Sequence, residues 1–193
     1  MITLHQTKGG TLGHITRRLI HISIIFLPFI YYDWIVPTVS NIRIAHHLII
    51  LAMIAVLIFE LLRLKCRFVI FAQRDYEATQ ICSFAWGILS IGFVLLFSPT
   101  ISFSVAIIAS CALVDPLLGE LKTKIKRSIG LFLVGMIAVI LIWLICALHY
   151  HTPIWIAFLM GPITVLCEWP SFKWIDDNAL MMLIPLIVVL IIH

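Results

Sequence analysis

The sequence predicts an all-α protein, a polytopic bundle of about seven transmembrane helices that forms one integral-membrane domain over residues 1–193. First, 63% of the residues are hydrophobic and 11% are charged, whereas a soluble domain keeps about a quarter of its residues charged. Second, apolar stretches close to the ~20 residues that cross a bilayer recur along the chain. Third, the charged residues gather in every second connection between the predicted spans. This composition excludes a disordered chain, a coiled coil, a disulfide-stapled module and an ordinary nucleic-acid binder.

The first three spans are predicted at 19–39, 44–62 and 79–97. The first follows Arg17 and Arg18 and is longer than the apolar core of a signal peptide, so we expect it to be retained as a helix. Asp33 interrupts it near its outer end, where we expect interfacial anchoring. A basic segment that contains Arg63 and Arg74 separates the second span from the third.

The last four spans are predicted at 101–119, 129–149, 153–170 and 178–193. The fourth and fifth are long enough to cross a bilayer alone, and the last two are shorter. Proline disfavours helical geometry at the residue before it. We therefore expect the end of the fourth span to be unwound at Asp115-Pro116, which would free backbone groups for a polar cavity.

Lysines and arginines orient the bundle, because positive charge resists translocation across the membrane. Twelve of the thirteen fall in the N-terminal segment and in the second, fourth and sixth connections, and Arg43 alone falls on the other side. The pattern predicts seven spans with a cytoplasmic N-terminus and an external C-terminus. The short chain favours a prokaryotic plasma membrane over the endoplasmic reticulum, which remains the alternative.

Carboxylates share this face, although the positive-inside rule hardly affects acids. Eight of the nine lie there: Glu60, Asp75, Glu77, Asp115, Glu120, Glu168, Asp176 and Asp177. Oxygen ligands suit Mg²⁺, and lysine or arginine suits the phosphates that Mg²⁺ accompanies. The sequence therefore predicts a metal and phosphate site at the cytoplasmic face.

Two segments carry the sharpest candidates. Asp115 is followed within a dozen residues by four bases, and its alternative role is to cap a short cytoplasmic helix. Asp176-Asp177-Asn178 precedes the last span, where a single residue would suffice as an N-cap. Neighbouring residues do not share a helix face. We expect one of the two aspartates to bind a metal and the other to cap or orient.

Three further groups of polar residues have a structural role as the alternative to a functional one. Arg17 and Arg18 share a helix face with His21, and a histidine at a helix end is more often an interfacial hydrogen bonder. Arg74-Asp75-Tyr76-Glu77 can be a solvated helix start. Glu60 and Arg63 can be a simple i,i+3 ion pair.

Taken in order, these elements resemble the CTP-dependent membrane lipid kinases, the family of dolichol kinase, phytol kinase and CTP-dependent diacylglycerol kinase. The elements are Arg17-Arg18-Leu19-Ile20-His21, Glu60-Leu61-Leu62-Arg63, Arg74-Asp75-Tyr76-Glu77, Asp115 with Gly119 and Lys126-Arg127-Ser128, and Glu168 with Asp177-Asn178…Pro185. The resemblance covers most of the chain. It implies phosphoryl transfer from CTP, with Mg²⁺, to a polyprenol-like, dolichol-like or diacylglycerol alcohol.

On this hypothesis Asp115 and Asp177 are catalytic and, with Asp176, hold the metal. The nucleotide-binding residues are then Lys124, Lys126, Arg127, Ser128, Asn178, Arg74, Glu77, Arg18 and His21. Two alternatives stay open: a cytidylyltransferase of the CDP-diacylglycerol synthase type, and a transporter or scaffold without catalysis. The expected partners are the nucleotide and the lipid, with no nucleic acid, and the sequence leaves room for an oligomer.

Overall fold

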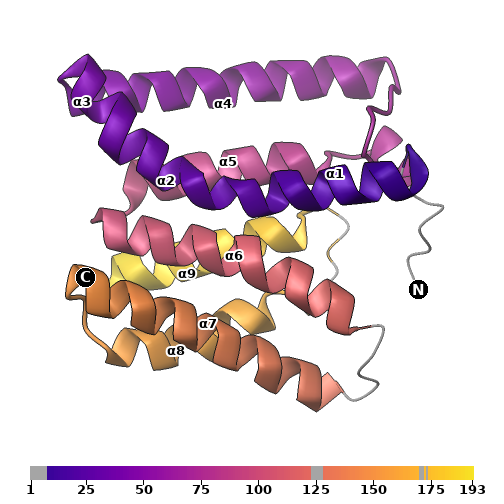
Figure 1. Cartoon of the computed structure of the whole chain (residues 1–193). Helices are drawn as coiled ribbons and strands as arrows, with labels where there is room; N and C mark the ends of the chain where they lie inside the picture. The colour runs from indigo at the N-terminus through magenta and orange to yellow at the C-terminus, as the bar shows by residue number, and fades with distance from the viewer. Residues whose placement is uncertain (1–7, 123–127, 170–171, 173) are drawn as a thin grey trace.

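The structure is a computed structural model that describes residues 8–122, 128–169, 172 and 174–193. Seven apolar helical segments run back and forth along one axis (Figure 1), and the ranges just given contain no β-strand. Four segments are long and apolar enough to cross a membrane, and three are shorter apolar helices. The prediction of an all-α membrane bundle is confirmed.

The first segment is one long helical run, Gly10–Val39, with two local changes of pitch. α1 (Gly10–Ser23) passes through a 3₁₀ turn at Ile24–Phe26 into α2 (Leu27–Phe29), and a π-helical turn at Ile30–Ile35 leads into α3 (Val36–Val39). Prolines at positions 28 and 37 lie beside these changes. Proline lacks the N–H that an α-helix needs, so a tighter or wider turn re-pairs the backbone there.

The predicted start of this span, residue 19, was wrong, because the helix already begins at Gly10. Arg17 and Arg18 therefore lie inside the helix and do not precede it. Each is neutralised by a carboxylate from another segment: Arg17 by Glu77 and Arg18 by Glu120. Paired arginines are tolerated at the edge of a bundle where lone ones are expensive.

The remaining helices are α4 (Ile42–Lys65), α5 (Ser83–Phe97), α6 (Ile101–Leu121), α7 (Ser128–Tyr150), α8 (Trp155–Leu166) and α9 (Asp177–Ile192). Their starts lie within a few residues of the predicted ones. Side-chain caps set several of these boundaries. Asn41 accepts a hydrogen bond from the Arg43 N–H at 2.9 Å, and Asp176 accepts one from the Asn178 N–H at 3.1 Å.

α6 continues through Asp115-Pro116, so the predicted unwinding there was wrong. Proline removes one intrahelical hydrogen bond, but the neighbouring turns are held by packing. Val114 and Leu118 on either side are fully buried, and Leu118 lies over Gly135 of α7. α6 is the central helix of the bundle, with most of its side chains buried. Burial outweighs the local preference of the residue before proline.

Glycine allows α8 to lie close to α7. A Cβ placed on Gly161 would lie 2.6 Å from Ile140 Cγ1, which is closer than real side chains approach. Small residues permit such approach between membrane helices, where packing is the main attraction. Gly92 of α5 plays the same part against α4, since its Cβ would lie 2.5 Å from Met53 Sδ.

Helix lengths differ enough to matter for the site. α8 has 12 residues and is about 18 Å long, whereas the hydrocarbon layer is about 30 Å thick. α6 has 21 residues and reaches about 31 Å. Figure 1 shows α8 and α9 stopping short of α6 and α7 at the end of the bundle near which the N-terminus lies. We call this end, which holds Lys65, Lys122 and Asp177, the charged end.

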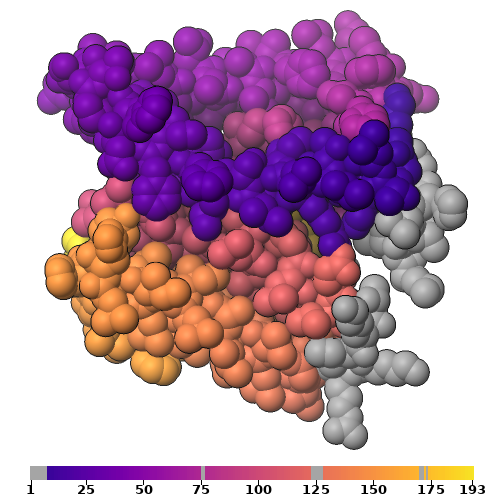
Figure 2. All heavy atoms as spheres, viewed as in Figure 1, coloured from indigo at the N-terminus to yellow at the C-terminus, as the bar shows by residue number. Residues whose placement is uncertain are grey.

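The N-terminal helices cover one side of this core. α1 packs along α6, and α4 packs against α5. Figure 2 shows side chains of α5 still visible between α1 and α4, so these two helices do not close over it. α4 is the most peripheral element, and most of its apolar side chains are exposed, as expected for a surface that faces lipid.

Candidate metal centre at the charged end

Three carboxylates from three different segments meet at the charged end. Asp115 lies on α6, Glu168 lies in the turn after α8, and Asp177 is the first residue of α9. One oxygen of each lies within 4.8 Å of the others. Oxygens that share one ion at about 2.1–2.6 Å lie at most about 4–5 Å apart. We call Asp115, Glu168 and Asp177 the acid cluster, and its spacing and oxygen chemistry fit a divalent cation.

Glu168 is the most buried member, with 6% of its surface exposed. Its Oε1 accepts a hydrogen bond from Lys122 Nζ at 2.6 Å. Its Oε2 is buried and has no hydrogen-bond partner within the part of the chain that the structure describes. Burial, and then the charge of Asp115, raise the pKa of Glu168 to about 7. Buried polar atoms are nearly always paired, and this oxygen beside two acids has the chemistry of a cation ligand.

Short α8 places Glu168 at this depth. α8 ends at Leu166, short of the ends of α6 and α7. The turn that follows it therefore lies deeper in the bundle than those ends. The absence of a side chain at Gly161 lets α8 lie close to Ile140 of α7, seven residues before Glu168. The local features that position Glu168 are thus a short helix and a glycine contact.

Asp176 and Asp177 both accept the Asn178 N–H, Asp177 through its Oδ1 at 3.0 Å, and they differ in their further contacts. Asp176 Oδ1 accepts hydrogen bonds from the Asn178 N–H at 3.1 Å and from Asn178 Nδ2 at 2.8 Å. Asp176 therefore caps α9 and orients Asn178. Asp177 contributes its oxygen to the acid cluster. Asp176, predicted as a metal ligand, lies outside the cluster, and Glu168 occupies the third position.

Asp115 is approached by α1. His21 Nε2 lies 3.5 Å from Asp115 Oδ2 and 3.1 Å from the Cys111 carbonyl oxygen. Arg18, three residues earlier on the same face, pairs with Glu120 on the next turn of α6. Arg18 and His21, predicted as nucleotide-binding residues, thus lie beside Glu120 and Asp115 of α6.

Arg17 and Glu77 form a second polar contact, between α1 and the segment before α5. Arg17 Nη1 lies 3.3 Å from Glu77 Oε1, and Ser83 Oγ donates to the same oxygen at 3.0 Å. The Arg74 backbone N–H donates to Glu77 Oε2 at 3.4 Å. Glu77 is 1% exposed. The alternative that the segment 74–77 is a solvated helix start is wrong for Glu77, which joins α1 to the start of α5.

Glu60 and Arg63 form the predicted i,i+3 ion pair, at 2.7 Å and fully buried. Glu60 Oε1 also accepts from the Cys82 N–H at 2.7 Å, and Arg63 Nη2 donates to the Gln80 carbonyl at 2.8 Å. All four residues serve to fasten the connection between α4 and α5. This pair supports the structure at a distance from the acid cluster.

The predicted phosphate-binding bases Lys124, Lys126 and Arg127 lie outside the described residues. Ser128, from the same prediction, is exposed and begins α7. Sequence reasoning named Glu168 without giving it a ligand role and gave Lys122 none. One signal was available, because Lys122 lies seven residues, about two helical turns, after Asp115 and so on the same face.

No family model, curated protein or solved structure matches the chain. The case for a function therefore depends on the geometry of this site.

Proposed function

We propose that the protein is a metal-dependent phosphotransferase that moves a phosphoryl group from a nucleoside triphosphate, CTP, to the hydroxyl of a membrane lipid. The observation that supports it best is the buried Glu168 Oε2, which lies beside Asp115 and Asp177 and has no hydrogen-bond partner among the described residues. Three carboxylates held together without a cation repel one another. An ion at this point would pair all three.

Mg²⁺ is the proposed ion, since it prefers carboxylate oxygens and commonly bridges protein acids to phosphates. Asp115, Glu168 and Asp177 would hold it and leave further positions for phosphate and water. Its chemistry is to neutralise charge that develops on the transferring phosphoryl group. Asn178, oriented by the Asp176 cap, lies beside the cluster and can donate a hydrogen bond to a phosphate oxygen.

Lys122 supports a phosphate side to the site. It is half exposed, lies at the end of α6, and its ammonium already contacts Glu168. The sequence adds Lys124, Lys126 and Arg127 directly after it. Arg18 of α1 adds a positive group beside Glu120, and His21 adds an imidazole beside Asp115. Phosphoryl transfer requires mainly positioning and charge neutralisation, which this set offers.

The acceptor is proposed to be a lipid alcohol because the chain is a membrane bundle with few residues outside the helices. The hydroxyl oxygen attacks the terminal phosphorus, the bond to the leaving nucleoside diphosphate breaks, and the hydroxyl proton passes to Asp115 or Asp177. The products are a lipid phosphate and CDP. We place the site at the cytoplasmic face of a prokaryotic plasma membrane, following the distribution of lysine and arginine.

Position-labelled CTP tests this proposal on the purified protein in nanodiscs that contain mixed lipid alcohols. Transfer of the terminal phosphate to lipid, abolished in Asp115→Asn and retained in Asp33→Asn, is the expected result. Asp33→Asn is a matched control because Asp33 is an exposed acid toward the other end of the bundle. Transfer of the innermost phosphate would instead indicate a cytidylyltransferase.

Absence of transfer from CTP, ATP and other triphosphates would contradict the enzyme proposal and favour a transporter or scaffold. Metal binding is measured separately, by titrating Mn²⁺ and following its electron paramagnetic resonance signal. If the protein binds Mn²⁺ but transfers no phosphate, the proposed reaction is wrong and the proposed metal site is retained.

A further inference from the structure

A second feature of the charged end is a partly open pocket of about 300 Å³. It lies where the end of α4, the start of α5, Phe172 and residues 174–176 meet. Leu64, Ile81, Trp86 and Ile175 supply apolar walls. We infer that this pocket, which we call the rim pocket, receives the hydroxyl-bearing end of the lipid acceptor. The inference rests on the proposed function and deepens it.

The chemistry of the rim pocket favours a neutral amphiphile. Its polar lining consists of Thr79, Gln80, Ser83 and Asp176, and the described residues that line it include no lysine, arginine or histidine. A triphosphate placed there would face the acidic Asp176 with no counter-charge from these lining residues, which is unfavourable in a partly buried site. A hydroxyl or an ester can hydrogen-bond to the amide, hydroxyl and carboxylate groups, and hydrocarbon can contact the aromatic and aliphatic walls.

The rim pocket and the acid cluster are joined by adjacent residues of the chain. Asp176 lines the pocket, and the next residue, Asp177, belongs to the cluster. On the other side of the cluster, Glu168 contacts Lys122 at the end of α6. The chain of contacts runs from Lys122 through Glu168 and Asp177 to Asp176 and the pocket. Acceptor and donor would thus reach the metal from different sides, as in-line transfer requires.

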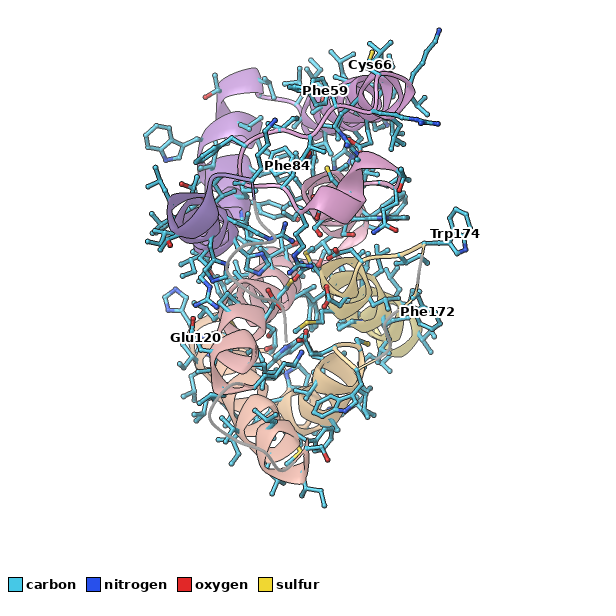
Figure 3. All side chains as sticks on the ribbon, turned by 90° about the vertical axis from the view of Figure 1, so that its right-hand side faces the viewer. Phe59, Cys66, Phe84, Glu120, Phe172 and Trp174 are labelled. Carbon is cyan, nitrogen blue, oxygen red and sulfur yellow. The ribbon has the colours of Figure 1, made fainter. Side chains whose placement is uncertain are left out.

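The side-chain view supports this division. Figure 3 shows Phe172 and Trp174 projecting outward on the side opposite Glu120, which lies near the end of α6. Trp174 is 80% exposed and Phe172 is 61% exposed. Exposed tryptophan is typical of the membrane–water interface, where the polar end of a lipid lies. The opening of the rim pocket is therefore at a depth that suits a lipid hydroxyl.

Size limits what the pocket can hold. About 300 Å³ is at the lower end of the range for small-molecule sites, roughly 300–1,000 Å³. The pocket accommodates the polar end and the first carbons of a lipid, and the remaining chain would extend into the bilayer. Leu61, one helical turn before Leu64 on α4, is 67% exposed and offers apolar surface along that direction.

Photo-crosslinking tests the inference without requiring turnover. The probe is a long-chain primary alcohol with a diazirine near its hydroxyl, mixed into nanodiscs with the full chain, and adducts are mapped by mass spectrometry. Adducts on 79–86 and 172–176 are expected. Ile81→Trp or Leu64→Trp, which fill the pocket, should remove them. Ile192→Trp, in the pocket at the opposite end, is the matched control and should retain them.

In the transfer assay, Ile81→Trp should raise the KM for the lipid alcohol roughly tenfold or more, with the KM for CTP unchanged. Adducts at other positions, or adducts and a lipid KM unaffected by both filling variants, would overturn the inference. So would crosslinking of azido-CTP to these residues. Pocket adducts without any phosphate transfer would uphold the pocket and contradict the proposed function.

Discussion

Lys122 and Glu168 are 46 residues apart in the chain and form a 2.6 Å contact between the ends of α6 and α8. The ammonium is half exposed, whereas the carboxylate is almost fully buried. This contact satisfies one oxygen of Glu168 and leaves the other beside Asp115 and Asp177 without a described partner. An exposed base thus reaches the one buried member of the acid cluster.

Glu168→Gln should weaken Mn²⁺ binding at least tenfold, because the change removes one of three charged ligands while keeping the side chain's shape. The Lys122 contact can still be made by the amide oxygen. The measurement is Mn²⁺ titration followed by electron paramagnetic resonance. Asp33→Asn, an acid outside the cluster, should bind Mn²⁺ as the unaltered protein does. Equal affinities in all three proteins would show that no metal site is formed here.

Lys122→Met should raise the KM for CTP roughly tenfold, since a hydrogen bond to a charged group contributes about 1.5–3 kcal/mol. The comparison is Lys65→Met, a similar exposed lysine at the end of α4. Steady-state kinetics at saturating lipid measures the KM for CTP of both variants, and only Lys122→Met should raise it. A rise in lipid KM with CTP unaffected would place Lys122 on the acceptor side and contradict the proposed division of the site.

Metal affinity should increase as the pH rises through about 7, the raised pKa of Glu168. A protonated carboxyl must lose its proton to bind the ion, so protons compete with metal below that pH. By linkage, the metal-free protein is stabilised by this group below its unfolded pKa and loses that stability as the pH rises through about 7. Mn²⁺ titrations between about pH 5 and 8 should show the slope, and Glu168→Gln should make it shallower.

Removing one partner of the buried Glu60–Arg63 pair should destabilise the protein by about 3–5 kcal/mol, because the other charge stays buried alone. Arg63→Met tests this, with Lys65→Met as an exposed control on the same helix. Unfolding in mixed detergent micelles, followed by circular dichroism, measures the loss. The double variant Glu60→Gln with Arg63→Met should recover part of it. A stable Arg63→Met would mean that the pair does not fasten the connection between α4 and α5.

Gly161→Ala should cost about 1–3 kcal/mol, the usual penalty for overpacking, since its Cβ would lie 2.6 Å from Ile140 Cγ1. It should also weaken Mn²⁺ binding, because α8 carries Glu168 at its end. Ile140→Ala in the same chain removes the contacted atoms and should restore both properties. Gly87→Ala on α5, where a Cβ meets open space, is the matched control. If Gly161→Ala destabilises the protein but leaves Mn²⁺ binding unchanged, the packing of α8 does not position the acid cluster.

Local sequence patterns predicted the helices well because a bilayer sets helix length segment by segment. The starts of α4, α6, α7 and α9 follow from apolar stretches and from caps such as Asn41 and Asp176. The start of α1 was missed, since the hydropathy of Arg17 and Arg18 alone does not reveal that each has a carboxylate partner. The unwinding expected at Pro116 was wrong for a similar reason, because the packing of Val114 and Leu118 is not visible in a local preference.

The sequence by itself determined that this chain is a membrane bundle whose acids and bases collect at one end, and it singled out Asp115 and Asp177. Only the tertiary structure decided that Glu168 completes the cluster, that Asp176 caps α9, and that Glu77 is buried against Arg17. The physical reason is the distance along the chain over which each effect acts. Hydropathy and capping act within a turn or a span, whereas the position of a carboxylate among its partners depends on how short α8 packs through Gly161 against α7 and beside α9.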